Sequence, residues 1–401
     1  MSEHGGPVER QHETAKAITM PYAQAVREFI RRPGCPEYVT VLVLITVCKA
    51  LTYGASVYTH GVSPLSWQGL ELLPSIWHRW DAGWYMQIAA HGYGTDGGAQ
   101  GSIAFYPLYP WLIRLMHVVM PNYPVAALVV SCLVSVLGCM VFYSLARFEF
   151  GRSVALWSLV TLLLFPTGYF FHAPYTEGLF LLLSVGAFFA ARRGNWPLAG
   201  WVGGAAALTR TPGLLLLPAL LVEWYSQPVG ERKAWPQAAW LGLIPVGWMV
   251  YLLINVQVYD TPLAFMSAQE VHWKVTLAWP WVSLEKALVR TRFLTQLVSL
   301  NEGFIHGGAH LGAVVLLLIG LLWSLVRLRY SYSVFLLLVT LQVTALNFLL
   351  STPRLMLSGF PLFFMLGHVA QNKILRLLWF VLALPLLWVL LQRFVGGQWA
   401  F

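Results

Sequence analysis

Long apolar runs separated by short polar segments recur along the chain from residue 36 to residue 393. Most runs approach the roughly 20 residues with which an α-helix crosses a bilayer, and none alternates as a membrane β-strand does. The run over 198–223 is broken at 209–213 by the sequence Thr-Arg-Thr-Pro-Gly, so we expect two half-length helices that meet at a polar tip. With this pair counted as two crossings, the pattern predicts an all-α polytopic membrane protein with about 11 spans. The expected spans are 37–59, 125–147, 154–171, 178–191, 198–223, 240–256, 308–326, 334–350, 356–370 and 377–391.

The polar segments divide the chain into regions. Residues 1–36 are expected to form a cytoplasmic tail, 37–393 a single transmembrane domain, and 394–401 a C-terminal tail. Two longer polar segments, 60–104 and 257–305, are expected to be loops that together form the functional face of the protein.

A helix is expected within the first of these loops, over residues 75–91, because glycine and other turn residues end its pattern. On such a helix Trp77, Asp81 and Trp84 would share one face, at spacings of four and three residues. The segment 105–120 is apolar but contains two prolines, so we interpret it as a membrane-surface or re-entrant helix instead of a span.

The short turns between spans carry the basic residues. With the spans as counted, these turns all fall on the side of the N-terminal tail, which the positive-inside rule makes cytoplasmic. They are 147–152, 192–193, 232–233, 327–329 and 373–376. The opposite, extracytoplasmic side then gathers Asp81, Glu177, Arg210 and Arg354 with the 257–305 loop. Residues far apart in the sequence are thus expected at one membrane face.

Composition narrows the class further. Hydrophobic residues make up 58% of the 401 residues and charged residues 10%, against roughly 25% charged in a soluble domain. The net charge of +9 fits basic cytoplasmic turns, and no basic helix or RNA-binding pattern is present, so no nucleic-acid partner is expected.

Asp81 is the candidate catalytic residue. It follows Trp77 and Trp80 and precedes Trp84 and Tyr85, whereas a solvated loop would carry small polar and charged residues. Aromatic rings cover the apolar face of a sugar while a carboxylate can take a hydroxyl proton. The alternative is a helix-surface acid paired with a neighbouring arginine.

Two arginines are candidates for binding a phosphate, since a guanidinium group bonds phosphate oxygens in a bidentate manner. Arg210 interrupts an apolar stretch, and Arg354 lies at a helix boundary. The alternative for both is anchoring of helix ends at the membrane interface. Glu177 begins a predicted span, where it either compensates the helix dipole or binds a sugar hydroxyl.

Further aromatic and polar residues of the same face are candidates for binding the sugar or the acceptor. They are Trp80, Trp84, Tyr85, Tyr175, Glu177, His78, His272 and Trp273. The alternative for the tryptophans of the second loop is an aromatic belt at the membrane interface. His78, His172 and His272 lack the HxH or HxxxH spacing of a zinc site, so neither a metal site nor a cofactor is expected. The sequence leaves the help of a divalent metal open.

Several motifs, in order, resemble those of the PIG-V-like mannosyltransferases, over roughly residues 37–372. The matching segments are Trp80-Asp81-Ala82, His91-Gly92-Tyr93, Ala104-Phe105-Tyr106-Pro107, Ala173 to Phe180, Ala207 to Gly213, Asp260 to Phe265, Ala268-Gln269 and Pro353-Arg354. Trp84 stands where the eukaryotic members have histidine, and the outer loops look short, which suggests a prokaryotic-type relative.

The resemblance implies a GT-C-fold glycosyltransferase that moves a sugar, usually mannose, from a polyprenyl-phosphate donor at the extracytoplasmic or lumenal face. Its partners would be that donor, a lipid, glycan or protein acceptor, and membrane lipids. It would sit in the plasma membrane of a prokaryote, or in the endoplasmic reticulum membrane of a eukaryote. We expect Asp81 to act as the general base of an inverting transfer. The alternative is a flippase, transporter or scaffold for lipid-linked sugars that performs no catalysis.

Overall fold

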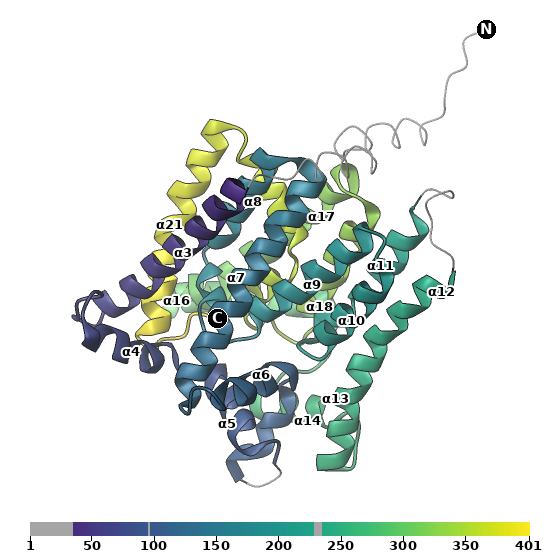
Figure 1. The fold of residues 1–401 in the computed structure, drawn as a ribbon. Helices are drawn as coiled ribbons and strands as arrows, with labels where there is room; N and C mark the ends of the chain where they lie inside the picture. Colours follow the sequence, from purple (N-terminus) through teal and green to yellow (C-terminus); the bar gives the residue numbers. More distant parts are fainter. Residues whose placement is uncertain (1–34, 95–96, 228–234) are drawn as a thin grey trace.

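The computed structural model describes residues 35–94, 97–227 and 235–401. Nearly all of the tail predicted over 1–36, and the basic pair at 232–233, lie outside these residues. The described residues form helices and a single isolated β-bridge, between Leu277 and Leu346. The helical class predicted from the apolar runs is therefore confirmed (Figure 1).

The helices follow one another along the chain with short connections. In the first half they are α3 Cys35–Tyr58, α4 Trp67–Trp77, α5 Asp81–His91, η1 Gly97–Ala104, α6 Leu108–His117, α7 Tyr123–Phe150, α8 Arg152–Leu163, η2 Gly168–Phe171, α9 Glu177–Arg192 and α10 Trp196–Ala207. In the second half they are η3 Thr211–Gly213, α11 Leu216–Tyr225, α12 Trp235–Ala238, η4 Ala239–Gly242, α13 Leu243–Tyr259, α14 Ala264–Trp273, α15 Pro280–Leu297, α16 Leu300–Gly303, η5 Phe304–Gly308, α17 Ala309–Arg327, α18 Tyr330–Thr344, α19 Thr352–Leu355, η6 Met356–Ser358, α20 Pro361–Val369 and α21 Lys373–Val395.

Five helical stretches of the described residues are long and apolar enough to cross a membrane. They are Pro36–Tyr58, Tyr123–Phe150, Pro236–Tyr259, Leu300–Arg327 and Lys373–Val395. Other apolar helices, such as α8, α11 and α18, are shorter, because the apolar runs that contain them are interrupted. The chain is thus a polytopic membrane protein, and the count of about 11 spans stays a prediction.

The expected break at 209–213 is confirmed. Helix α10 ends at Ala207, Arg210 is fully extended, and η3 turns the chain back before α11 begins. A Cβ atom on Gly213 would lie 2.3 Å from the carbonyl carbon and oxygen of Ala206, so only glycine allows η3 to pack this closely on α10.

Three of the basic turns meet at one end of the helices, where their arginines form buried ion pairs. Arg192 bonds Glu149 and lies 3.1 Å from Glu223, which also pairs with Arg329 at 3.1 Å. Glu149, Arg192 and Glu223 are each no more than 3% exposed. This contact explains how turns predicted on one side pack together there, at the top of Figure 1.

Helices α4, α5, α6 and α14 lie together at the opposite end (Figure 1). The single helix expected over 75–91 is wrong, since the chain breaks between α4 and α5 at His78–Trp80. Trp77 therefore shares no helix face with Asp81. Its ring instead stacks on His172 with centroids 6.3 Å apart. Over 105–120 only the ten-residue α6 forms, too short to cross a bilayer.

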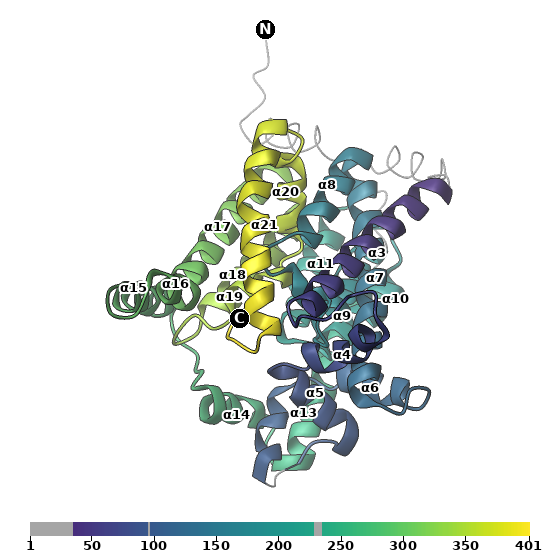
Figure 2. The ribbon, with the colours of Figure 1, turned by 90° about the vertical axis from the view of Figure 1, so that its left-hand side faces the viewer.

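The second long loop divides into two parts. Helix α14 packs against η1 of the first loop, whereas α15 and α16 lie on another side of the molecule, beside α17 and α18 (Figure 2). Helix α14 therefore lies beside the first loop and α15 does not, and the expectation that 60–104 and 257–305 together form the functional face stays a prediction.

The C-terminal segment 394–401 folds back onto the helices. The carbonyl of Ala400 accepts a hydrogen bond from the Tyr169 hydroxyl at 2.5 Å, and the ring of Phe401 meets that of His310 edge to face. Ala400 and Phe401 are no more than 2% exposed, so these two residues belong to the core.

Candidate functional site

Asp81 follows a strained turn. Trp80 has φ = 48° and ψ = −116°, a conformation that costs a residue with a side chain about 1–3 kcal/mol. Two hydrogen bonds hold the turn at Arg79, whose carbonyl accepts from the Tyr175 hydroxyl and whose guanidinium donates to the carbonyl of Val395, each at 2.9 Å. Asp81 is the first residue of α5, where the helix dipole favours a carboxylate.

A chain of four charged side chains carries the site. Arg354 donates from Nη1 to Asp81 Oδ2 and from Nε to Glu177 Oε1, each at 2.6 Å. Arg210 donates from Nη1 to the same Glu177 oxygen, also at 2.6 Å. Asp81 and Arg354 are 273 positions apart in the sequence, so only the fold brings them together.

Each member of this chain lies at an interruption of regular structure. Glu177 begins α9, Arg210 is the extended residue before η3, and Arg354 lies in the single turn α19. The residue before α19, Ser351, has φ = 51°, which turns the chain sharply between α18 and α19. Broken helices with polar tips allow charged groups to lie at the end of an apolar bundle.

The two carboxylates and two guanidinium groups of this ion-pair chain neutralise one another in a largely buried region. The side chains of Glu177 and Arg354 are 1% and 9% exposed, whereas that of Asp81 is 25% exposed. Buried ions need paired partners, since their desolvation is costly. The Arg354 guanidinium also lies 4.4 Å from the centre of the Tyr175 ring, and this cation–π contact stabilises the cation. Asp81 is therefore the most accessible charge among these three side chains.

The alternative in which Asp81 pairs with a neighbouring arginine is wrong, because its partner is Arg354 and Arg79 bonds a backbone carbonyl instead. Of the two expected phosphate-binding arginines, only Arg354 bonds Asp81, and both Arg210 and Arg354 bond Glu177. Glu177 Oε2 is buried without a hydrogen-bond partner among the described residues.

An aromatic cluster joins α5 to α14. The ring of Trp84 stacks on Phe105 with centroids 5.8 Å apart, and it meets Trp273 edge to face at 6.0 Å. His272 lies 6.4 Å from Trp84 in the same arrangement. Trp84 and Trp273 are partly exposed and His272 is exposed, so the cluster retains accessible surface.

The remaining candidates differ in their accessibility. Trp80 is 46% exposed and meets the Trp399 ring edge to face, and His78 is exposed as well. Tyr175 and Tyr85 are buried. Burial raises the pKa of the Tyr85 phenol, and the Asp81 carboxylate raises it further, so this hydroxyl keeps its proton at neutral pH.

Within the part of the chain that the structure describes, no group of three histidine, cysteine, aspartate or glutamate residues could hold a metal ion. The buried His172, predicted at the same face, lies against Trp77 and Tyr53.

Sequence reasoning missed the support behind the site. The ring of Tyr175 makes a cation–π contact with Arg354. The Val395 carbonyl accepts a hydrogen bond from Arg79, and the ring of Trp399 packs on that of Trp80. Val395 and Trp399 come from the end of the chain, where no motif marks them. The positive φ of Trp80 has no sequence signal either, because tryptophan rarely adopts it.

Comparison with known proteins agrees with the predicted resemblance. Residues 105–257 match the family described as dolichyl-phosphate-mannose-protein mannosyltransferase. GPI mannosyltransferase 2 of Yarrowia lipolytica is 39% identical over 90 residues, which are 22% of this chain and 25% of that protein. Similarity to membrane mannosyltransferases, as the motifs predicted, is therefore confirmed for part of the chain.

Two solved structures are similar in outline. ArnT from Cupriavidus metallidurans bound to undecaprenyl phosphate gives a TM-score of 0.49 at 15% identity, over 82% of this chain and 59% of that one. The Archaeoglobus fulgidus oligosaccharyltransferase in complex with zinc and sulfate gives 0.48 at 12% identity, over 89% and 53%. The chain thus spans a quarter of the curated relative and somewhat over half of these structures.

Proposed function

We propose that this protein is a GT-C-fold glycosyltransferase that moves mannose from a polyprenyl-phosphate donor to an acceptor hydroxyl on the extracytoplasmic side. The observation that carries the proposal is the chain Asp81–Arg354–Glu177–Arg210. It combines an accessible carboxylate with two guanidinium groups beside an aromatic surface. The names of the matching family and relative, both mannosyltransferases, support mannose as the sugar.

The donor phosphate binds Arg210 and Arg354 in this proposal. Both guanidinium groups meet on Glu177 Oε1, so one anion can contact both of them. An incoming phosphate competes with Glu177 for their N–H donors, and the arginines then stabilise the charge that develops on the departing polyprenyl phosphate. Glu177, which is 2% exposed, orients the two arginines and does not itself bind sugar.

Asp81 acts as the general base. Arg354 bonds its Oδ2, which leaves Oδ1 for the proton of the acceptor hydroxyl. As that proton moves to Asp81, the acceptor oxygen bonds the anomeric carbon, and the carbon–oxygen bond to phosphate breaks with its electron pair on the phosphate. Direct displacement inverts the anomeric centre. Phosphate is a good leaving group, so no general acid is required, unlike in glycoside hydrolysis.

The aromatic cluster binds the sugar or the acceptor. Trp84 and Tyr85 lie three and four residues after Asp81 on α5, so they project from the same side of the helix as the acid. Trp84, Trp273 and the exposed His272 offer ring faces and a polar group to a hexose or to the acceptor. The exposed Trp80 and His78 extend this surface.

The distribution of charge favours catalysis over transport. A flippase or transporter for lipid-linked sugars needs polar groups along a path through the membrane. The buried ion pairs instead form two clusters, one at each end of the helices, and the buried Lys49 within α3 bonds the carbonyl of Phe171. The cluster of basic turns makes its own end cytoplasmic by the positive-inside rule, so the Asp81 end is extracytoplasmic or lumenal.

The test uses the purified full chain with a radiolabelled polyprenyl-phosphate mannose and a panel of hydroxyl acceptors. We expect transfer with release of polyprenyl phosphate, its loss in Asp81→Asn, and nearly unchanged donor binding in that variant. Arg210→Ala should weaken donor binding. Donor movement across a vesicle membrane without cleavage would favour a transporter, and full turnover by Asp81→Asn would reject the base.

A further inference from the structure

Helix α15 lies across the direction of the spans. In Figure 2 it is seen end-on, whereas α17 and α21 run along the page. Its inner face carries small buried residues, Ser283 and Ala287, and the Ser283 hydroxyl donates to the Thr344 carbonyl at 2.7 Å. One face of α15 is therefore fixed to the helix bundle, a second packs through Thr291 and Thr295 against α16 and η5, and the remaining faces are uncovered.

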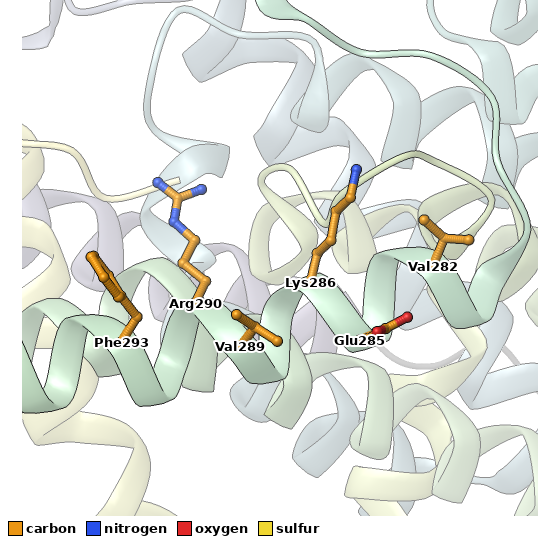
Figure 3. Close-up of a pocket in the computed structure, with 6 residues that line it drawn as sticks. All are labelled: Val282, Glu285, Lys286, Val289, Arg290 and Phe293. Carbon is orange, nitrogen blue, oxygen red and sulfur yellow. The ribbon is translucent and has the colours of Figure 1, made fainter.

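One of the uncovered faces is a regular stripe. Six residues that recur on successive turns of one helix face line a hollow of about 360 Å³ along it (Figure 3). They are Val282, Glu285, Lys286, Val289, Arg290 and Phe293. Val289 and Phe293 are 61% and 57% exposed. On a helix that lies in the membrane interface, apolar side chains exposed to this degree contact acyl chains.

The same stripe carries two cations. Lys286 and Arg290 are one helical turn apart and rise from the same side of α15 (Figure 3). Neither forms an ion pair with any residue that the structure describes, and Glu285 of the same stripe does not neutralise them. An ammonium and a guanidinium group beside an apolar surface suit a phosphate that is attached to hydrocarbon.

Two tryptophans indicate the depth of α15 in the membrane. Trp279 and Trp281, at the start of the helix, stack with ring centroids 5.0 Å apart and are 68% and 61% exposed. Exposed tryptophans gather where the hydrocarbon meets the headgroups. A horizontal helix with such rings and unpaired cations fits the plane of the headgroups.

We propose that α15 lies in the extracytoplasmic interface of the bilayer and binds the headgroup of an anionic phospholipid. Lys286 and Arg290 hold the phosphate, and an acyl chain lies along Val289 and Phe293. Glu285, the acid of the stripe, accepts hydrogen bonds from headgroup hydroxyls, so the ligand is a phosphatidylglycerol-type lipid. This binding is independent of the proposed transferase activity.

The test is native mass spectrometry of the full chain released from nanodiscs made of equal amounts of phosphatidylglycerol and phosphatidylcholine. We expect wild-type protein to retain phosphatidylglycerol over phosphatidylcholine by at least about fivefold, and the Lys286→Gln/Arg290→Gln double variant to lose this preference. Arg292→Gln is the matched control, because Arg292 is an exposed cation of the same helix outside the stripe and should leave the preference unchanged.

Three results would overturn the proposal. Wild-type protein without a preference for phosphatidylglycerol would do so whether or not the variants fold. An equal loss in Arg292→Gln would indicate general attraction by the positive protein. Displacement of bound phosphatidylglycerol by an equimolar amount of polyprenyl phosphate would make the donor lipid, and not a bulk phospholipid, the occupant of the stripe.

Discussion

Replacing Glu177 by glutamine tests the central ion-pair chain through stability. The carboxylate is 2% exposed and accepts from two guanidinium groups at 2.6 Å. Removing one partner of a buried ion pair costs about 3–5 kcal/mol, because the other charge stays buried without compensation. Glutamine retains an acceptor oxygen, and Arg354 keeps Asp81, so we expect the lower end of this range, about 3 kcal/mol.

The assay is thermal unfolding of the full chain in one detergent, followed by tryptophan fluorescence, with Glu302→Gln as the control. Glu302 lies 3.4 Å from Arg393, and its side chain is 30% exposed, so its loss should cost about 0–1 kcal/mol. If the unfolding midpoint of Glu177→Gln were no lower than that of Glu302→Gln, the view that Glu177 stabilises a buried ion-pair cluster would be refuted.

The same variant has an opposite effect on ligand binding. Glutamine competes less than a carboxylate for Arg210 and Arg354, so polyprenyl phosphate should bind Glu177→Gln more tightly than wild type. A fluorescence titration with polyprenyl phosphate in the same detergent measures this. Weaker binding would mean that Glu177 is needed to orient the arginines more than it competes with phosphate for them.

Three further predictions concern the backbone and the ion pairs at the end that carries the basic turns. Trp80→Gly should unfold at a higher temperature than Trp80→Ala, by a margin equivalent to about 1 kcal/mol. Both variants lose the indole ring, but only glycine adopts the positive φ of this position without strain. Equal unfolding midpoints would argue against backbone strain at Trp80. Gly213→Ala should lower the yield of folded protein in size-exclusion chromatography, as its Cβ would meet the backbone of Ala206 at 2.3 Å, and a normal yield would contradict this. Arg192→Met should cost about 3–5 kcal/mol in thermal unfolding, because the buried Glu149 loses its cation and Glu223 keeps only Arg329. A loss below about 1 kcal/mol would show that the cluster is hydrated.

The sequence predicted the placement of distant polar residues better than it predicted local helix geometry. Counting spans and assigning the basic turns to one end places the four charged residues Asp81, Glu177, Arg210 and Arg354 at the opposite end. The structure joins these four side chains by ion pairs. The count constrains which end a turn occupies, because each span reverses the direction of the chain. It contains no information on which acid bonds which arginine.

The helix over 75–91 was predicted wrongly because its apolar spacing is continuous through the break. Trp80 leaves the helical conformation only since Tyr175 and Val395 hold Arg79 from other parts of the fold. The same limit applies to α15, because the sequence does not show that the Ser283 hydroxyl bonds the Thr344 carbonyl of α18.

The sequence determined, through its hydropathy, turn residues and basic turns, that this chain is a bundle of membrane helices, that one apolar run is broken at Arg210, and that Asp81 lies at the end opposite the basic turns. These properties depend on the energy of placing each segment in hydrocarbon, which is nearly additive along the chain. Only the tertiary structure decided that Glu177 lies between two arginines and that Arg354 bonds Asp81. It alone also decided that Val395, near the C-terminus, bonds Arg79 in the turn before Asp81. Such contacts depend on the packing of segments 33 to 316 residues apart, so they are properties of the assembled fold and of no single segment.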